Sequence, residues 1–214
     1  MEATRITAIR HGETPWNRDL RIQGHLDIGL NDIGREQARR LACALAERDT
    51  IDAIYSSDLA RARDTAQATA NALGASLTLT PTLRERCFGE YQGMTFAQVS
   101  DTWPHEAERW RKRDPDWRPP GGGESLADLR QRLAQAVDQL AARHVGQHIA
   151  LFTHGGVLDI LYRIAAGLGI QDARTWQLGN AAVNRLLWTP DGISIVGWGD
   201  ETHLEGASLD ESTA

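Results

Sequence analysis

Short, fully apolar runs alternate along this chain with longer stretches in which apolar residues recur at helical spacing. A continuous apolar run is typical of a strand in a parallel sheet, because helices cover both of its faces. The predicted strands cover residues 6–9, 51–55, 77–79 and 149–152. The predicted helices run from a cap at Asn31 to about Arg48, from a cap at Asp58 to Leu73, from a cap at Ser125 to about His144, and onward from Gly155.

The helix after Asn31 is expected to bury one side. Ile33, Ala38, Leu41 and Leu45 are assigned to that side. The next predicted helix has a signal at each end. Asp58 is a typical N-cap residue, and Gly74, just past the last helical residue, is a typical C-terminal stop.

The alternation of strands and helices predicts an α/β fold, a three-layer sandwich with a mostly parallel central sheet and helices on both faces. Residues 183–188 and 193–198 are apolar segments on either side of Pro190-Asp191-Gly192. That turn sequence indicates an antiparallel hairpin, which we expect at the edge of the sheet.

A length of 214 residues fits one domain spanning 1–214. Its irregular part, Trp103–Gly123, is rich in Trp, Arg, Pro and Gly and belongs to a predicted inserted helix and loop at about 94–123. Tryptophans are costly to leave in water, so two interpretations stay open. The insertion either forms a lid over a ligand or only packs on the core.

Composition narrows the function. With 41% hydrophobic and 24% charged residues the chain is an ordinary globular sequence, and its net charge of −6 disfavours general binding to nucleic acid or to a membrane surface. Cys43 and Cys87 form neither a disulfide framework nor a metal cluster, and Cys43 is expected to be buried. No secretory signal or membrane-spanning run is recognised, so we expect a cytoplasmic protein.

The chemistry gathers where strands end. His11 directly follows the first predicted strand, between Arg10 and Gly12, and His154 directly follows the strand 149–152. Since the carboxyl ends of parallel strands meet at one edge of a sheet, both imidazoles should lie there. Imidazole is a nucleophile at neutral pH, guanidinium matches phosphate oxygens, and Gly12 is expected to let an anion approach the backbone.

Three further residues are candidate site residues at this edge. Arg61 falls in the first turn of a helix, where a cation opposes the helix dipole and an anionic ligand would explain it. Glu85, between two arginines, suits either a surface ion pair or proton transfer. Gly155 opens a helix whose free N–H groups could bind an anion.

Five motifs in this order resemble the histidine phosphatase superfamily, the phosphoglycerate mutase-like proteins, over nearly the whole chain. They are Arg10-His11-Gly12-Glu13-Thr14 with Trp16-Asn17, Ser57-Asp58-Leu59 with Arg61 and Thr65-Ala66, Leu83-Arg84-Glu85 with Phe88-Gly89 and Gly93, Gly123-Glu124-Ser125, and Thr153-His154-Gly155-Gly156.

The resemblance implies a catalytic set. His11 would be the nucleophile that forms a phosphohistidine, and Glu85 would be the general acid. Arg10, Arg61 and His154 would surround the phosphoryl group, His154 being charged when phosphate is bound.

The resemblance also implies further phosphate-binding positions. Asn17 would donate to a phosphate oxygen and help to orient His11, while Gln23, Gly24 and Gly155 would supply further donors. No cofactor and no metal is implied. A metal site on His11 and His154 is disfavoured, because the neighbouring arginines would repel a dication. Asn180 and His203 also resemble family segments but receive no role.

The expected function is a metal-independent phosphomonoesterase of the small phosphatase branch, acting on small phosphorylated metabolites. The runner-up is a phosphoglycerate mutase, which the short span between Glu85 and Ser125 disfavours. A third possibility is a non-catalytic binder of phosphate ligands or an interaction protein. The expected partner is a small phosphate monoester, and a homodimer through the edge hairpin is left open.

Overall fold

A six-stranded sheet forms the centre of the computed structural model, which describes residues 2–205. The strands are β1 (Thr4–Arg10), β2 (Ala53–Ser56), β3 (Leu77–Leu79), β4 (His148–Thr153), β5 (Val183–Thr189) and β6 (Gly192–Asp200). Their order is β3-β2-β4-β1-β5-β6. The first four in this order run parallel, whereas β5 pairs antiparallel with both β1 and β6. The predicted mostly parallel sheet with an antiparallel edge hairpin is confirmed.

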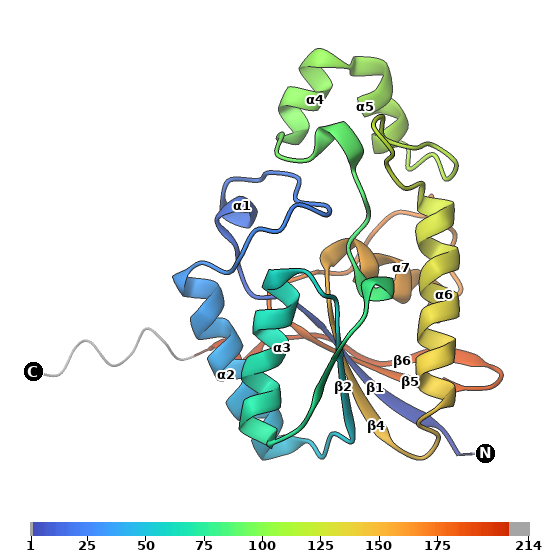
Figure 1. The fold of residues 1–214 in the computed structure, drawn as a ribbon. Coiled ribbons are helices and arrows are strands. Elements are labelled where there is room, and N and C mark those ends of the chain that lie inside the picture. The colour runs from blue at the N-terminus through green and yellow to red at the C-terminus, as the bar shows by residue number, and fades with distance from the viewer. Residues whose placement is uncertain (1, 206–214) are drawn as a thin grey trace, which may run out of the picture.

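The described residues also form seven α-helices. They are α1 (Pro15–Arg18), α2 (Asp32–Arg48), α3 (Ala60–Leu73), α4 (Phe96–Thr102), α5 (Pro104–Arg111), α6 (Leu126–Ala142) and α7 (Gly155–Ala165). Short 3-10 segments cover Pro81–Leu83, Gly89–Tyr91 and Thr202–Leu204. Helices α2 and α3 lie on one side of the strands and α6 lies on the other (Figure 1). None of the helices between residues 2 and 205 is both long and apolar enough for a bilayer crossing.

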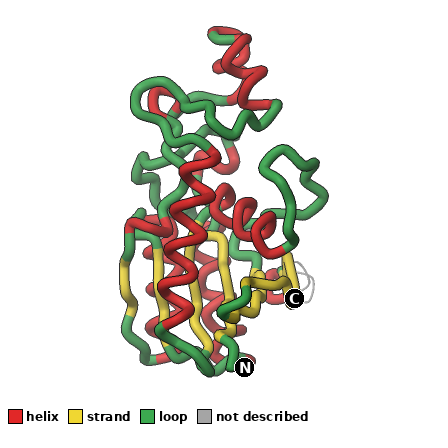
Figure 2. Tube along the Cα trace, turned by 90° about the vertical axis from the view of Figure 1, so that its right-hand side faces the viewer, coloured by secondary structure: helices red, strands yellow, loops and turns green. Residues whose placement is uncertain are grey.

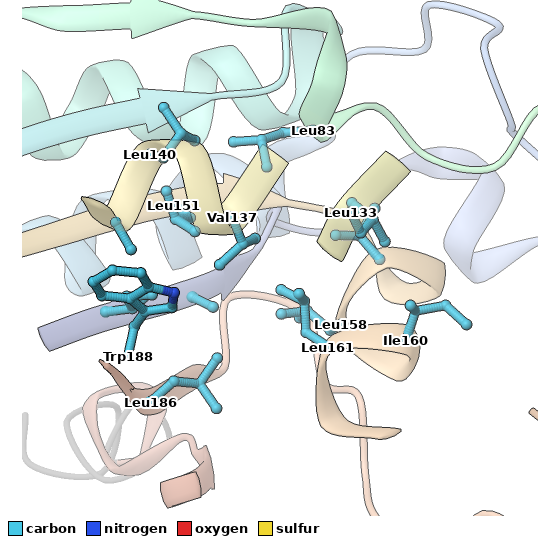
Figure 3. Close-up of a cluster of buried hydrophobic side chains, with 14 of the residues drawn as sticks. Leu83, Leu133, Val137, Leu140, Leu151, Leu158, Ile160, Leu161, Leu186 and Trp188 are labelled. Carbon is cyan, nitrogen blue, oxygen red and sulfur yellow. The ribbon is translucent and has the colours of Figure 1, made fainter. Parts of the chain in front are cut away.

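Strand β4 is buried on both faces and contributes side chains to two hydrophobic cores. Ile149 and Leu151 belong to the cluster formed with α6 and α7, and Ala150 and Phe152 belong to the cluster formed with α2 and α3. Successive side chains of a strand point to opposite faces, which explains this division. Figure 3 shows the first cluster, where leucines of α6 and α7 pack against Trp188 of β5.

Two expectations for α2 are wrong. Ala38, Leu41 and Leu45 are buried as predicted, but Ile33 is 54% exposed and Cys43 is exposed. Each residue advances a helix by about 100°, so Cys43, two positions after Leu41, lies on nearly the opposite side of the helix. Ile33 likewise lies about 140° from Ala38 around the helix axis.

The predicted cap at Asp58 is also wrong, whereas those at Asn31 and Ser125 are confirmed. Helix α3 begins after Leu59, which makes no side-chain cap. The carboxylate of Asp58 instead forms two hydrogen bonds with Arg84, at 2.7 and 2.6 Å. The backbone N–H of Ala60 donates to Asp27 Oδ1 at 2.6 Å, so a distant loop caps the helix.

The inserted segment forms the helices α4 and α5, which lie together beyond one end of the sheet (Figures 1 and 2). Their aromatic residues pack on one another: Tyr91 is surrounded by Trp103, Trp110 and Trp117 at centroid distances of 5.2–6.2 Å. Trp117 is buried in this cluster. The tryptophans therefore form a small apolar core of their own, and a lid function for the segment stays a prediction.

Candidate active site

His11 and His154 lie side by side at the carboxyl ends of β1 and β4. The two strands are adjacent and parallel, with Arg10 paired to Thr153, and the N–H of His11 donates to the carbonyl of Thr153 at 3.0 Å. The imidazole centroids are 5.2 Å apart. The sheet thus brings together two histidines that are separated by most of the chain, as the sequence predicted.

A single hydrogen bond fixes the His11 ring. Its Nδ1 lies 2.7 Å from the carbonyl oxygen of Gly12. A carbonyl can only accept, so Nδ1 carries the proton and, in the neutral ring, Nε2 presents a lone pair. Burial, followed by the charges of Arg61 and Arg10, lowers the pKa of His11 well below its usual range. The structure therefore holds His11 as a neutral imidazole with an unprotonated Nε2.

His154 is completely buried next to this ring and does not line the cavity described below. Its Nε2 lies 2.9 Å from Ser57 Oγ, while its Nδ1 has no hydrogen-bond partner among residues 2–205. Burial and the charge of Arg61 lower the pKa of His154 well below the usual value. Without a bound anion His154 is neutral.

Arg61 and Arg10 are held by backbone carbonyls rather than by carboxylates. Arg61 donates to the carbonyls of Gly24 at 2.8 Å and Leu26 at 3.0 Å, and Arg10 donates to that of Leu178. Each has a buried Nε without a partner in the described part of the chain. Burial lowers the pKa of Arg61 to about 10, which leaves it charged at neutral pH.

The side chains of Arg10, His11 and Arg61 line a cavity of about 160 Å³. Its lining contains most of the residues assigned from the sequence: Arg10, His11, Asn17, Gln23, Gly24, Arg61 and Glu85, joined by Arg21 and Phe88. Two guanidinium groups and a neutral imidazole around so small a space suit a phosphoryl group. Gly155 does not line this cavity and instead lines a larger, adjoining cleft, described below.

Asn17 is placed by a capping box on α1, in which Thr14 and Asn17 bond to each other's backbone N–H. Its Oδ1 also accepts from the side chain of Asn180 at 3.4 Å, and Asn180 donates to the His11 carbonyl at 2.9 Å. Asn180, which received no role from the sequence, therefore ties Asn17 to the backbone of His11. The His11 ring itself is oriented by Gly12.

The carboxylate of Glu85 is fixed by two backbone N–H groups. Its Oε1 accepts from Arg86 at 2.8 Å and its Oε2 from Gly156, in the first turn of α7, at 2.9 Å. The expected anion site at this helix start is thus taken by the protein's own carboxylate. The surface ion pair considered for Glu85 is absent from residues 2–205, since Arg84 binds Asp58.

Gly12 makes room for helix α2, and not, as expected, for an anion at the backbone. A Cβ on Gly12 would lie 2.5 Å from the carbonyl oxygen of Gly34, on α2. A Cβ on Gly34 would lie 2.0 Å from the carbonyl oxygen of Glu13. Both glycines are required because the loop after β1, at Gly12 and Glu13, packs directly on the first turn of α2.

A cleft of about 730 Å³ adjoins the small cavity, and Arg10, Glu85 and Phe88 line both. Glu85 therefore lies at the border between a space of phosphate size and a space for a larger group.

Arg21, Phe88 and Ser57 are site residues that received no role from the sequence. Residues 2–205 contain no group of three or more His, Cys, Asp or Glu side chains arranged to hold a metal ion. His203, half-buried, lines neither space.

The family model for the histidine phosphatase superfamily (branch 1) matches residues 6–201. The chain belongs to the histidine phosphatase superfamily. It is 41% identical over 202 residues to phosphoglycerate mutase-like protein 4 of Arabidopsis thaliana, covering 94% of this chain and 86% of that one.

Two further relatives carry phosphatase names. The metal-independent phosphoserine phosphatase of Arabidopsis thaliana is 37% identical over 210 residues, covering 97% of this chain and 86% of that one. The structure of a mycobacterial glucosyl-3-phosphoglycerate phosphatase superposes with a TM-score of 0.82 at 32% identity, covering 92% and 99%. This member of the superfamily is a phosphoryl-transfer enzyme.

The two neutral histidines predict how stability depends on pH. Below about pH 6.5 the unfolded chain takes up protons that folded His11 and His154 resist, so stability falls by up to about 1.4 kcal/mol per pH unit for each histidine. We expect His154→Gln to reduce the slope of the unfolding free energy between pH 7.5 and 5.5, measured by urea titration. The matched control is His105→Gln, because His105 is exposed. Equal slopes for wild type and His154→Gln would contradict the burial of a neutral imidazole.

Proposed function

We propose that this enzyme is a metal-independent phosphomonoesterase in which His11 takes the phosphoryl group and water releases it. The observation that carries the proposal is the position of Glu85. A phosphoryl group in the small cavity and its alcohol in the large cleft would place the ester oxygen at their border, beside the Glu85 carboxyl.

In the first step His11 Nε2 attacks phosphorus. The N–P bond forms and the P–O bond to the alcohol breaks. An alkoxide is a poor leaving group, so protonated Glu85 gives its proton to the ester oxygen as that bond breaks. The alcohol leaves neutral, and Glu85 is left as a carboxylate held by the N–H groups of Arg86 and Gly156.

In the second step water enters the position that the alcohol has left. The Glu85 carboxylate takes a proton from the water. The water oxygen bonds to phosphorus as the P–N bond to His11 breaks. Inorganic phosphate leaves, and His11 returns to its neutral form with Nδ1 still on Gly12.

The arginines stabilise the charge of the transferring group. Arg10 and Arg61 remain charged and, being bound only to carbonyls, keep donors for the equatorial oxygens. Arrival of a dianion favours protonation of His154, which then adds positive charge behind His11. No metal ion is needed for this work.

The remaining assigned positions would contribute donors around the anion. Asn17, Gln23 and Gly24 line the cavity, and Gly155 lies beside the Arg10 guanidinium. Gln23 Oε1 accepts from Thr14 at 3.0 Å, which leaves its amide nitrogen for a phosphate oxygen.

Water as the acceptor is favoured over a second substrate hydroxyl. Between Glu85 and Ser125 the chain forms the short helices α4 and α5 and one 3-10 segment, and these pack on their own aromatic core. The cleft next to Glu85 is large enough to admit water with the substrate. Mutase activity remains the second candidate, because a 41% identical relative is named phosphoglycerate mutase-like.

Two expectations for partners and place stay predictions. Self-association is proposed through β6, the edge strand, on which Val196 is 65% exposed. A cytoplasmic location is likewise proposed from the sequence alone.

The choice of acceptor is testable with 3-phosphoglycerate in the presence of excess chelator. We expect release of inorganic phosphate and glycerate to be faster than formation of 2-phosphoglycerate, and we expect His11→Ala to abolish both. Faster formation of 2-phosphoglycerate would make the enzyme a mutase. A requirement for added metal would contradict the mechanism, and absence of turnover with any phosphate ester would favour the non-catalytic binder.

A leaving-group comparison tests the role of Glu85. Nitrophenolate leaves without protonation, so Glu85→Gln should still phosphorylate His11 from p-nitrophenyl phosphate while dephosphorylation slows. We expect a burst of about one nitrophenol per site and a loss of about 10²-fold or more in kcat for an alkyl phosphate. Equal losses of the first turnover with both substrates, at unchanged thermal stability, would remove the general-acid role.

A further inference from the structure

Arg86 is a buried cation that the phosphate-transfer mechanism does not use. Only 3% of its surface is exposed, yet it lines the 730 Å³ cleft and is absent from the lining of the phosphate cavity. Among residues 2–205 its guanidinium makes no ion pair, because its hydrogen bonds go to carbonyls and the nearby Glu124 carboxylate pairs with Arg132. Its contact with Glu85 is made by its backbone N–H. Buried charges in proteins are normally paired, so an unpaired one facing a cleft points to an anionic ligand.

The Arg86 side chain is fixed before any ligand arrives. It donates to the carbonyls of Glu124 at 2.7 Å and Trp117 at 3.2 Å, and its guanidinium lies 5.4 Å from the ring centroids of both Phe88 and Trp117. Burial lowers the pKa of Arg86 to about 10, so it is still charged at neutral pH. A preorganised cation loses little conformational freedom on binding.

The other charges of the cleft do not satisfy Arg86. Asp159 is shared by Arg113 at 2.6 Å and Arg163 at 3.0 Å. Arg174, on the exposed rim, has no ion pair among the described residues, and Glu201 is a second exposed rim residue. The cleft wall therefore carries unmatched positive charge in a chain whose net charge is −6.

Part of the wall is apolar. Phe88 and Trp110 stack at 5.1 Å between centroids, and Leu126 and Leu129 line the same cleft. A ligand in the cleft thus meets apolar side chains next to the fixed guanidinium of Arg86.

We propose that Arg86 determines specificity by binding a second anionic group, a carboxylate, on the alcohol part of the substrate. This inference rests on the proposed phosphatase function, because it places the alcohol in the cleft beyond Glu85. Nε and Nη2 of Arg86 donate to the carbonyls of Glu124 and Trp117, so Nη1 is the nitrogen left to donate to a carboxylate. Arg174 at the rim attracts the same charge. Substrates without a carboxylate leave the Arg86 charge buried and unpaired.

Two matched pairs of esters test this. O-phosphoserine differs from O-phosphoethanolamine, and 3-phosphoglycerate from glycerol 3-phosphate, in the carboxylate. We expect wild type to favour the carboxylate-bearing member of each pair in kcat/KM by about tenfold or more. Arg86→Gln should bring the ratio toward one, and Arg86→Lys should restore part of it. Arg143→Gln makes the same change in net charge at the far end of α6 and should keep the wild-type ratio.

Binding separates the subsite from the chemistry. Affinities of the same four esters for His11→Ala, measured by calorimetry, should show the same preference and lose it in His11→Ala/Arg86→Gln. Failure of wild type to cleave any ester would overturn the proposed function, and these affinities would still decide the subsite. A wild-type ratio near one, or an equal loss for both members of a pair in Arg86→Gln, overturns the proposal.

Discussion

The site depends on one hydrogen bond, from Nδ1 of His11 to the carbonyl of Gly12. It turns the ring, fixes its tautomer and leaves Nε2 as the atom with a free lone pair. The bond can form because the loop after β1 is held tightly: Gly12 packs on Gly34 of α2, and the N–H of Gly12 donates to Thr65 Oγ1 at 3.0 Å. A sheet, two helices and a glycine contact therefore serve to aim one nitrogen.

The electrostatics of the site follow from the same choice of partners. Had Arg10 and Arg61 been paired with carboxylates, their charge would be neutralised and the carboxylates would repel phosphate. Carbonyl oxygens hold the guanidinium groups in place while leaving their charge available. Burial lowers the pKa of His11, and the charges of Arg61 and Arg10 lower it further, so the ring stays neutral. Glu85, the carboxylate that lines the small cavity within the described residues, is held by backbone N–H groups, where the proposed mechanism has it exchange a proton with the ester oxygen.

Much of this architecture could be predicted from the sequence, because local patterns of apolar and polar residues determine it. Apolar runs and their order fixed the parallel sheet, and the positions of His11 and His154 after two of its strands placed both at one edge. The burial expected for Ile33 and Cys43 failed for a local reason, their position around the axis of α2. The other expectations that failed depended on contacts between distant segments. Asp58 binds Arg84 instead of capping its own helix, and the N–H expected to bind an anion at α7 is occupied by Glu85. Nor does any local pattern distinguish Arg86, whose burial is created by loops from elsewhere in the chain.

The most direct test of the central claim is the protonation state of His11, measured by ¹⁵N NMR of the histidine side chains at pH 7 without phosphate. The account predicts a neutral ring with a protonated Nδ1 and an unprotonated Nε2. A ring protonated on both nitrogens, or a neutral ring with its proton on Nε2, would contradict it.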